Sequence, residues 1–336
     1  MITKARNVSQ GFFSAAATKV EVGREKLADL LFELLNNISL NDFARLMTNE
    51  VSEAIQYADL CIGGKTCQRL SLLFNPHRLS TRTKNSRASC YEALKDRSFV
   101  SGLARAILVR KKEGVKFVDQ LYYALVLSIN AVQYICEFPP HIARDLCRDH
   151  AVNLNSKVLD PCAGWGGRMI GSSSICNSYT AYEPSKQTYR GLLELGAFLK
   201  VFRNDFQYNV LCEPYENSVA KKEFYDFAIT SPPYYDTELY SAENTNSLNR
   251  YKTFDKWVVG FYKPLIIKTM AQLKKKSSFI LNIGSRKYPL SQIMKEIVGK
   301  KKHKVEKLGN FLSGTGSGLG KSGEGESFYR ITKGGN

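Results

Sequence analysis

Long apolar runs are missing from this sequence of 336 residues. A membrane-spanning helix needs about 18 or more consecutive apolar residues, and no stretch of that kind occurs. The N-terminal segment MITKARNVSQ also lacks the apolar core of a signal peptide. We therefore expect a protein that has no membrane span and is located inside the cell.

Metal-binding patterns are missing as well. The eight cysteines form no CxxC pair, and the four histidines are scattered along the chain. A zinc site needs closely spaced ligands, so no metal centre is predicted. In an intracellular chain these cysteines are expected to be reduced and mostly buried thiols.

Acidic residues are few relative to basic ones. Asp and Glu number 31 against 48 Lys and Arg, which gives a formal net charge of +17. Such a balance favours a polyanionic partner, although many basic proteins bind no nucleic acid.

The first 136 residues have the pattern of a helical region. Apolar residues recur at helical spacing in four segments, 24–36, 42–58, 91–110 and 117–136. A polar, basic segment, NPHRLSTRTKNSR, begins at the turn signal Asn75-Pro76. It is either a solvated loop or an arm that contacts phosphates. We interpret residues 1–136 as a helical accessory region.

Residues 137–336 follow a different pattern. From Lys157 onward, helical segments alternate with short apolar ones: KVLD, SYTAYE, FYDFAITS, SFILNIG and ESFYRIT. This alternation predicts an α/β fold, a mostly parallel sheet with helices on both faces. Because Pro139-Pro140 interrupts the helical pattern, we place the domain boundary near residue 137.

A glycine-rich turn follows the first of these strands, in the segment VLDPCAGWGGR at 158–168. Ligands of parallel α/β sheets bind at the carboxyl ends of the strands, and glycine lets the backbone approach them closely. The spacing is not that of a dinucleotide-binding loop, and Asp160 would repel a pyrophosphate. A carboxylate there suits a cationic cofactor such as S-adenosylmethionine.

Glu183 stands about 20 residues further on, after the next apolar segment. An acidic residue at the end of the second strand suits the two hydroxyls of a ribose. The alternative is a surface glutamate before a turn.

The segment Ser231-Pro232-Pro233-Tyr234 follows the buried strand DFAIT. Adjacent prolines make a stiff, extended turn that offers carbonyl acceptors and few N–H donors. An exocyclic amino group of a base is a double donor, which the Ser231 side chain and the Pro232 carbonyl could orient. Tyr234 would then stack on a base turned out of its helix. Taken alone, the segment could equally be a rigid loop.

These two segments together resemble motifs I and IV of the amino-methyltransferases that modify cytosine N4 or adenine N6 in DNA. Phe138-Pro139-Pro140 is similar to motif X of the family, Glu183 matches its second-strand acid, and Glu216 matches its third. The resemblance covers roughly residues 137–331 and implies a Rossmann-like methyltransferase sheet. SPP with an aromatic residue favours cytosine N4 over adenine N6.

The resemblance also implies the site residues. S-adenosylmethionine would be bound by Phe138, Pro139, Asp160, Pro161, Ala163, Gly164, Gly166, Glu183 and Glu216. Catalysis would fall to Ser231, Pro232, Pro233 and Tyr234. Asp236 or Glu238 could accept the proton released after transfer, as could water.

The order of the motifs resembles the gamma arrangement, in which target recognition follows the catalytic motifs. Little chain remains after the last predicted strand, so recognition would come from region 1–136, the insert after Tyr234 or the basic segment 295–307. We expect a nucleic-acid partner, DNA rather than RNA, in the cytoplasm or nucleoid of a prokaryotic or virus-infected cell. A restriction-modification role, an RNA substrate or a catalytically silent nucleic-acid-binding protein of this fold are the alternatives.

Three other features are interpreted conservatively. Cys162 follows a proline but lies in the glycine turn, so a covalent cysteine mechanism is not expected. The run GTGSGLGKS at 314–322 has the wrong spacing for a phosphate-binding loop of nucleotide hydrolases. Lysine clusters at 274–276 and 300–302 are either solvated surface or contacts to a nucleic-acid backbone.

Overall fold

A computed structural model describes residues 24–48, 50–65, 67, 69–83, 88–109, 137–236, 238–240, 243–284, 287–300, 303–311, 319–320 and 326–334. The chain divides into two compact units. One comprises Met1–Asn49 and Pro76–Cys136, the other Glu50–Asn75 and Glu137–Asn336. The sequence predicts a single boundary near residue 137, whereas the second unit also includes Glu50–Asn75. The helix predicted over 117–136 lies outside the described residues.

The described part of the first unit is mainly helical. Its elements are α2 (Arg24–Asn36), α3 (Leu40–Met47), the 3-10 helix η1 (Pro76–Ser80), β1 (Arg82–Thr83), α6 (Cys90–Ala93) and α7 (Arg97–Val109). Leu27, Leu31 and Leu35 are spaced by four residues and are buried on one face of α2. That helix packs against α7, so the predicted helical character of this region is confirmed where it is described.

Two helices predicted as continuous are interrupted. The pattern over 42–58 predicts one helix, but α3 ends at Met47 and α4 (Glu50–Cys61) begins a new one. Thr48 is extended, with φ −135° and ψ 154°, and its hydroxyl donates to the Ala44 carbonyl at 2.8 Å. In 91–110 the break precedes α7, where the Asp96 carboxylate accepts the Ser98 amide at 2.7 Å. Such local side-chain bonds compete with helix continuation, and hydrophobic periodicity does not register them.

The second unit is built on an eight-stranded sheet in the order β4-β3-β2-β5-β7-β10-β8-β9. The strands β4, β3, β2, β5 and β7 are mutually parallel, and β10 is antiparallel to both β7 and β8. The bounds are β2 (Lys157–Asp160), β3 (Ser178–Tyr182), β4 (Gln207–Leu211), β5 (Tyr225–Thr230), β7 (Leu273–Ile283), β8 (Lys304–Phe311), β9 (Leu319–Gly320) and β10 (Glu326–Thr332); the short β6 spans Glu238–Leu239.

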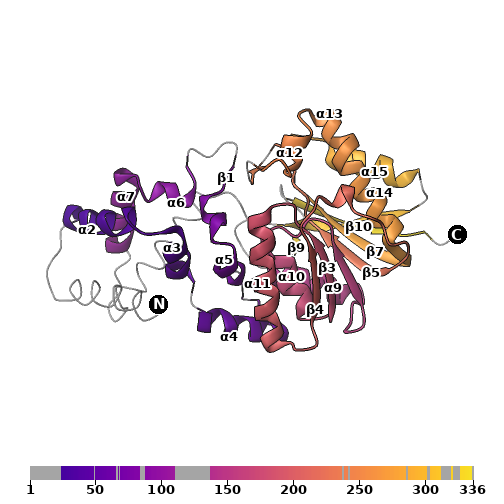
Figure 1. Ribbon diagram of the computed structural model, residues 1–336, viewed down its shortest axis with the longest axis horizontal. Helices are drawn as coiled ribbons and strands as arrows, with labels where there is room; N and C mark the ends of the chain where they lie inside the picture. Colours follow the sequence, from indigo (N-terminus) through magenta and orange to yellow (C-terminus); the bar gives the residue numbers. More distant parts are fainter. Residues whose placement is uncertain are drawn as a thin grey trace. The chain divides into compact units, whose positions relative to one another are not determined.

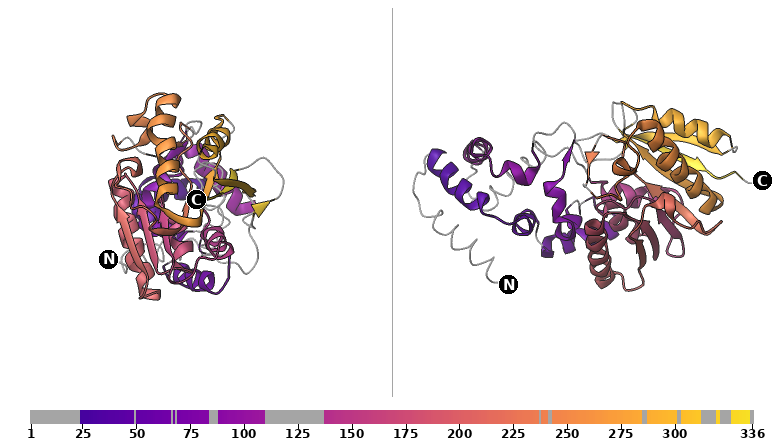
Figure 2. Two further views of the ribbon diagram at one scale, coloured as in Figure 1. Left: turned by 90° about the vertical axis from the view of Figure 1, so that its right-hand side faces the viewer. Right: turned by 45° about the horizontal axis from the view of Figure 1, so that its top comes forward.

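Both faces of this sheet are buried by helices, as Figures 1 and 2 show. Alternate residues of one strand belong to different hydrophobic clusters: Phe227 and Ile229 to one, Ala228 to the other. The first cluster joins the sheet to α9 (Pro140–Asp149), α10 (Gly167–Ser173) and α11 (Lys186–Phe202); the second joins it to α14 (Lys263–Gln272) and α15 (Leu290–Gly299). The predicted α/β fold, a Rossmann-like sheet with helices on both faces, is confirmed.

Residues 50–75 belong with this sheet because buried polar contacts anchor them to it. The Arg144 guanidinium is 3% exposed and donates to the carbonyls of Leu60 and Gly64 at the end of α4. After α5 (Leu70–Phe74), the Asn75 amide donates to the Trp165 carbonyl at 3.0 Å. The segment after α5 therefore contacts the glycine-rich turn, and the end of α4 is bonded to α9.

The remaining elements of the second unit lie between the sheet strands in the chain. They are the 3-10 helix η2 (Tyr215–Asn217), α12 (Ser247–Arg250), α13 (Phe254–Trp257) and the π-helical segment η3 (Val258–Tyr262). Among the described residues, no helix is long and apolar enough to cross a membrane.

Candidate functional site

The glycine-rich turn and the SPPY segment follow neighbouring strands. β2 and β5 are parallel, and Val158 and Leu159 pair with Phe227 and Ala228. The two turns are therefore on the same edge of the sheet, as the sequence predicted. Thr230, the last residue of β5, joins them: its hydroxyl donates to Asp160 at 2.8 Å and accepts the Cys162 amide at 3.1 Å.

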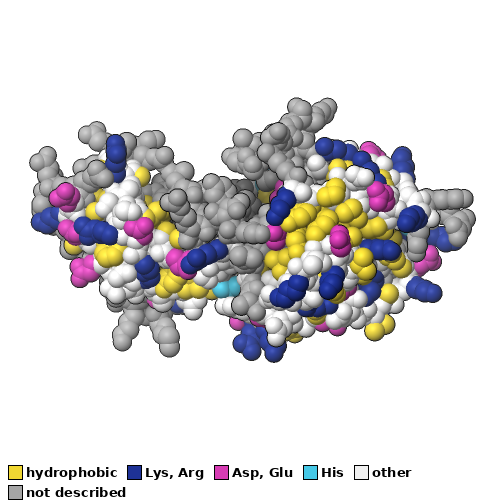
Figure 3. Space-filling view, turned by 90° about the horizontal axis from the view of Figure 1, so that it is seen from above, with side chains coloured by type: hydrophobic (Ala, Val, Ile, Leu, Met, Phe, Trp, Pro, Cys, Tyr) yellow, Lys and Arg dark blue, Asp and Glu magenta, His cyan; other side chains and the backbone are white. Residues whose placement is uncertain are grey.

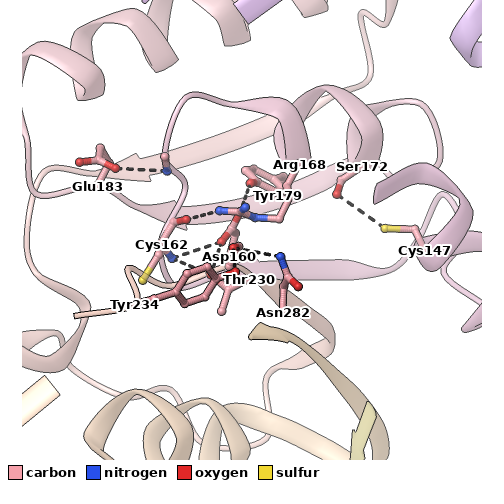
Figure 4. Close-up of polar contacts among 12 residues, drawn as sticks. Cys147, Asp160, Cys162, Arg168, Ser172, Tyr179, Glu183, Thr230, Tyr234 and Asn282 are labelled. Carbon is pink, nitrogen blue, oxygen red and sulfur yellow. Dashed lines mark hydrogen bonds and ion pairs between the residues drawn. The ribbon is translucent and has the colours of Figure 1, made fainter. Parts of the chain in front are cut away.

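Asp160 lies at the centre of this junction and is fully buried. One carboxylate oxygen accepts from Thr230 and from the Cys162 amide (3.2 Å). The other accepts from Arg168 Nε and the Tyr179 hydroxyl, each at 2.7 Å (Figure 4). Both oxygens are thus engaged within the protein. The sequence interpretation had Asp160 face a cation of the cofactor, but in the structure the cation beside it is Arg168, which also donates to the Cys162 carbonyl.

The glycine turn is partly exposed at two residues. Within 161–167 only Cys162 and Gly164 are partly exposed; Pro161, Ala163 and Gly166 are buried. Gly164 has φ +57°, and a Cβ placed on it would meet nothing within 4 Å. A backbone of this conformation favours glycine. Gly164 therefore exposes bare backbone toward open space at the carboxyl end of β2, which suits close approach of a ligand.

Phe138 and Pro139 reach the back of the same turn. Pro139 precedes the first residue of α9, and the Phe138 carbonyl would lie 2.1 Å from a Cβ on Gly167. The Phe138 ring lies 5.2 Å from the Arg168 guanidinium carbon. The segment that resembles motif X is thus brought against the turn, as the resemblance implies.

Glu183 follows β3 and contacts the exposed glycine. Its carboxylate accepts the Gly164 amide at 3.2 Å and the Ser185 amide at 2.9 Å. Burial raises the pKa of Glu183 to about 7, because the carboxylate loses water that these two bonds replace only in part. Near pH 7 the Glu183 carboxyl group is therefore partly protonated, and a ligand that donates hydrogen bonds to it would favour the charged form.

Glu216 lies in η2, beyond the end of β4. Its side chain is 3% exposed and pairs with Arg250 of α12 at 2.9 Å. Burial raises the pKa of Glu216 despite this partner. The parallel pairing of β3 with β2 and with β4 brings Glu183 and Glu216 to the same edge of the sheet as Cys162. Burial, then the nearby Asp160, raises the pKa of the Cys162 thiol far above its ordinary value, which argues against a thiolate nucleophile.

Hydrogen bonds to Ser231 fix the position of the SPPY segment. The Ser231 and Tyr234 hydroxyls lie 2.9 Å apart, and Asn282 Nδ2 donates to Ser231 Oγ at 3.3 Å. Pro232 is buried, and Pro233 is partly exposed. The Tyr234 ring is only 6% exposed and packs close to Gly284. The sequence interpretation gave this ring a stacking role on a base, but here it is part of the core and its hydroxyl orients Ser231.

Several residues of the site were not singled out from the sequence. Arg168 follows the glycines directly, so its position carried a signal, whereas Tyr179 and Thr230 lie inside apolar strands. Asn282 and Glu326 come from β7 and β10, far beyond the SPPY segment in the chain, and only the strand order brings them to it.

The other features singled out from the sequence either lie away from this site or have protein partners. The Asp236 carboxylate accepts from the Tyr288 hydroxyl at 2.8 Å and pairs with Lys287 at 3.0 Å. The Glu238 side chain and the run 314–318 lie outside the described part of the chain. Lys274, Lys275 and Lys276 begin β7 and are exposed, at the edge of the sheet opposite to the site. About 23–30 Å of strand separates them from its carboxyl end, at 3.3 Å per residue.

On the face drawn in Figure 3, the positive charge of the described residues does not form a single stripe. Figure 3 shows Lys and Arg side chains spread over the visible face of each unit, among acidic and apolar ones. In the described residues no group of three or more His, Cys, Asp or Glu side chains is arranged to hold a metal ion.

Comparisons with known proteins show that this chain is similar in fold to several solved structures. No protein-family model matches the chain, and no curated protein matches its sequence. Among solved structures, a tRNA methyltransferase from Aquifex aeolicus is 8% identical, with TM-score 0.39, over 60% of this chain and 70% of that one. A SAM-dependent O-methyltransferase from Thermotoga maritima is 11% identical, with TM-score 0.41, over 63% and 70%. An rRNA methylase from Streptococcus thermophilus is 12% identical, with TM-score 0.38, over 60% and 99%. Likeness of this degree carries no argument about substrate, so function is inferred from the site itself.

Proposed function

We propose that this chain transfers a methyl group from S-adenosylmethionine to an exocyclic amino nitrogen of a nucleic-acid base, in DNA and at cytosine N4 in preference to adenine N6. One observation carries the proposal. The glycine-rich turn and the SPPY segment end neighbouring parallel strands and are bonded to each other through Thr230 and Asp160. A methyl donor at the first turn and an amine at the second would be side by side.

The residues at the ends of β2, β3 and β4 fit the cofactor. Gly164 offers open space where a side chain would intrude, and Glu183 lies beside it at the position expected for a ribose. Glu216 follows the third strand, where the family resemblance expects contact near the adenine ring. When bound, S-adenosylmethionine supplies an electrophilic methyl group on a positively charged sulfur. Asp160 and Arg168 neutralise each other and keep the turn in shape.

The residues of the SPPY segment fit the amine. Ser231 is a partly exposed residue whose Oγ is fixed by Tyr234 and Asn282, and in this proposal Oγ accepts one amine N–H. The Pro232 carbonyl is the second acceptor in this proposal. Two acceptors would direct the nitrogen lone pair away from the ring plane, and holding it beside the donor accounts for most of the expected rate enhancement.

The nucleic-acid partner is inferred from the charge and the resemblance. A net charge of +17 favours a polyanion, and the SPPY sequence favours cytosine in DNA. Met1–Asn49 and Pro76–Cys136, the unit that does not carry the sheet, are the candidate for target recognition in this proposal. An RNA substrate is the alternative, and a restriction-modification role would require a partner nuclease.

Mass spectrometry of nucleosides tests this function directly. The purified protein would be incubated with S-adenosylmethionine and either unmethylated duplex DNA or total RNA, followed by complete digestion. We expect N4-methylcytosine in the DNA digest. N6-methyladenine would correct the base, and a methylated amine in the RNA digest alone would correct the polymer. No methylated nucleoside from either polymer, despite measurable cofactor binding, would contradict the function.

Cofactor affinity is expected to depend on pH through Glu183. The ionised carboxylate accepts hydrogen bonds from ribose hydroxyls better than the neutral acid does. Because burial raises its pKa to about 7, affinity should fall as pH is lowered through 7, by up to about tenfold per unit for one coupled proton. Calorimetric titration with S-adenosylhomocysteine at pH 6 and pH 8 measures this.

Glu183→Gln is the matched variant, since glutamine keeps the size and cannot ionise. We expect it to bind more weakly at pH 8 and to show little pH dependence. A wild-type affinity that is equal at both pH values would rule out the assigned role of Glu183.

A further inference from the structure

A chain of hydrogen-bonded side chains leads inward from Ser231. The Ser231 hydroxyl lies 2.9 Å from that of Tyr234, and the Tyr234 hydroxyl is in turn hydrogen-bonded to Glu326. Asn282 Nδ2 contacts both ends, at 3.3 Å from Ser231 Oγ and 2.5 Å from Glu326 Oε2. The antiparallel pairing of β10 with β7, in which Phe328 lies opposite Asn282, brings Glu326 to this position.

The direction of these bonds follows from the protons available. A carboxylate only accepts, so Tyr234 gives its single proton to Glu326, and Asn282 gives one of its two. The Tyr234 oxygen can then accept from Ser231, which leaves Ser231 Oγ as an acceptor toward Asn282 and toward an incoming group. The bond from Ser231 to Tyr234 and the bond from Tyr234 to Glu326 therefore both point toward Glu326, and Asn282 donates to the two ends.

We propose that Ser231, Tyr234 and Glu326 form a proton relay that carries the proton released by the methylated amine to the Glu326 carboxylate. The inference rests on the proposed function and adds to it a proton acceptor at a defined atom. It also gives Tyr234 a role that fits a ring buried in the core.

The proton balance closes within these groups. An amine that gains a methyl carbon carries two N–H bonds and a positive charge. One N–H bond breaks, and its electron pair stays on nitrogen, while the proton bonds to Ser231 Oγ. The Ser231 proton passes to the Tyr234 oxygen, and the Tyr234 proton bonds to the Glu326 carboxylate. The amine and Glu326 both end neutral, and the two hydroxyls are restored.

The surroundings of Glu326 suit an acceptor. Burial raises its pKa above the ordinary 4.5, against the hydrogen bonds from Asn282 and Tyr234 and the positive charge of Arg168. Asn282 of β7 and Tyr234 of the SPPY segment donate to the carboxylate, and Arg168 of α10 is the charged group that acts on it. A carboxylate with a raised pKa takes a proton more readily, because its charged form is less stabilised.

The relay is tested by single-turnover methyl transfer to unmethylated duplex DNA as a function of pH, together with calorimetric binding of S-adenosylhomocysteine. Because the charged form of Glu326 must accept, the wild-type rate should fall as pH is lowered through a pKa above 4.5. Glu326→Gln and Tyr234→Phe should each lower the plateau rate by about 10²-fold, the usual size of a proton-transfer contribution. Both should lose that limb of the pH profile and keep wild-type cofactor affinity.

Tyr234→Phe keeps the buried ring and removes only the hydroxyl, so it tests proton transfer with little change in packing. Wild-type rate and pH profile in this variant would overturn the relay. Tyr262→Phe is the matched control, because Tyr262 is also fully buried and loses one hydroxyl bond, to the Leu290 carbonyl at 3.1 Å. Glu306→Gln, on β8 and paired with Arg330, controls for the loss of a carboxylate.

A readout independent of turnover covers variants that are unstable. Carbon-13 NMR of labelled glutamate should give Glu326 a pKa above 4.5 in the wild type and a still higher one in Tyr234→Phe, because a donor to the carboxylate is lost. An ordinary pKa for Glu326 would overturn the relay. Absence of methyl transfer by the wild type to both DNA and RNA would contradict the proposed function and the relay with it. Wild-type transfer with unchanged variants would contradict the relay alone.

Discussion

Asp160→Ala is expected to destabilise the second unit by about 3–5 kcal/mol, the usual cost of leaving one partner of a buried ion pair alone. Arg168 would remain inside the protein without its carboxylate, and the Tyr179 and Thr230 hydroxyls would lose their acceptor. Because Asp160 holds the glycine turn to β5, cofactor binding should be lost as well. Urea unfolding followed by circular dichroism, with calorimetric titration of S-adenosylhomocysteine, measures both effects.

A surface ion pair provides the control for this prediction. Asp205 pairs with Arg203 at 3.2 Å, and its side chain is 45% exposed. Asp205→Ala should leave the unfolding midpoint nearly unchanged, since exposed pairs contribute little. If Asp160→Ala unfolded at the same urea concentration as the wild type, the buried ion pair would not have the structural role assigned to it.

Gly164→Leu is expected to abolish or strongly weaken cofactor binding while the protein stays folded. The backbone at φ +57° costs a non-glycine residue about 1–2 kcal/mol. No protein atom lies within 4 Å of the added Cβ, so the side chain enters only the space assigned to the cofactor. Overlap between the leucine side chain and the cofactor should lower the affinity for the cofactor by about 10- to 100-fold, because overpacking usually has a cost of this size.

Gly63→Leu is the matched control for that variant. Gly63 also has a positive φ, +111°, and open space around its Cβ, but it follows α4 and is not part of the glycine turn. Comparable losses of stability in the two variants, with affinity lost only in Gly164→Leu, would locate the cofactor at Gly164. Unchanged affinity in Gly164→Leu would place the cofactor elsewhere.

The fold class could be predicted from the sequence because strand and helix signals alternate clearly after residue 157. The apolar segments KVLD, SYTAYE, FYDFAITS, SFILNIG and ESFYRIT correspond to β2, β3, β5, β7 and β10. Two other strands carried no such signal. β4 has only one buried residue, Val210, and is an edge strand. β8, with sequence KVEKLGNF, overlaps the run taken for a basic segment. Their positions depend on pairing with β3 and β10, which are distant in the chain.

The position of each site residue along the chain could be predicted from the sequence, whereas its contacts could not. Local order along the chain is enough to place a glycine turn and an SPPY segment after two strands, because strand direction and turn geometry are short-range properties. The partners of each side chain depend on contacts between distant segments. Asp160 is saturated by Arg168, Tyr179 and Thr230, and Tyr234 is turned inward toward Glu326, because the strand order brings β2, β3, β5, β7 and β10 together at one edge of the sheet.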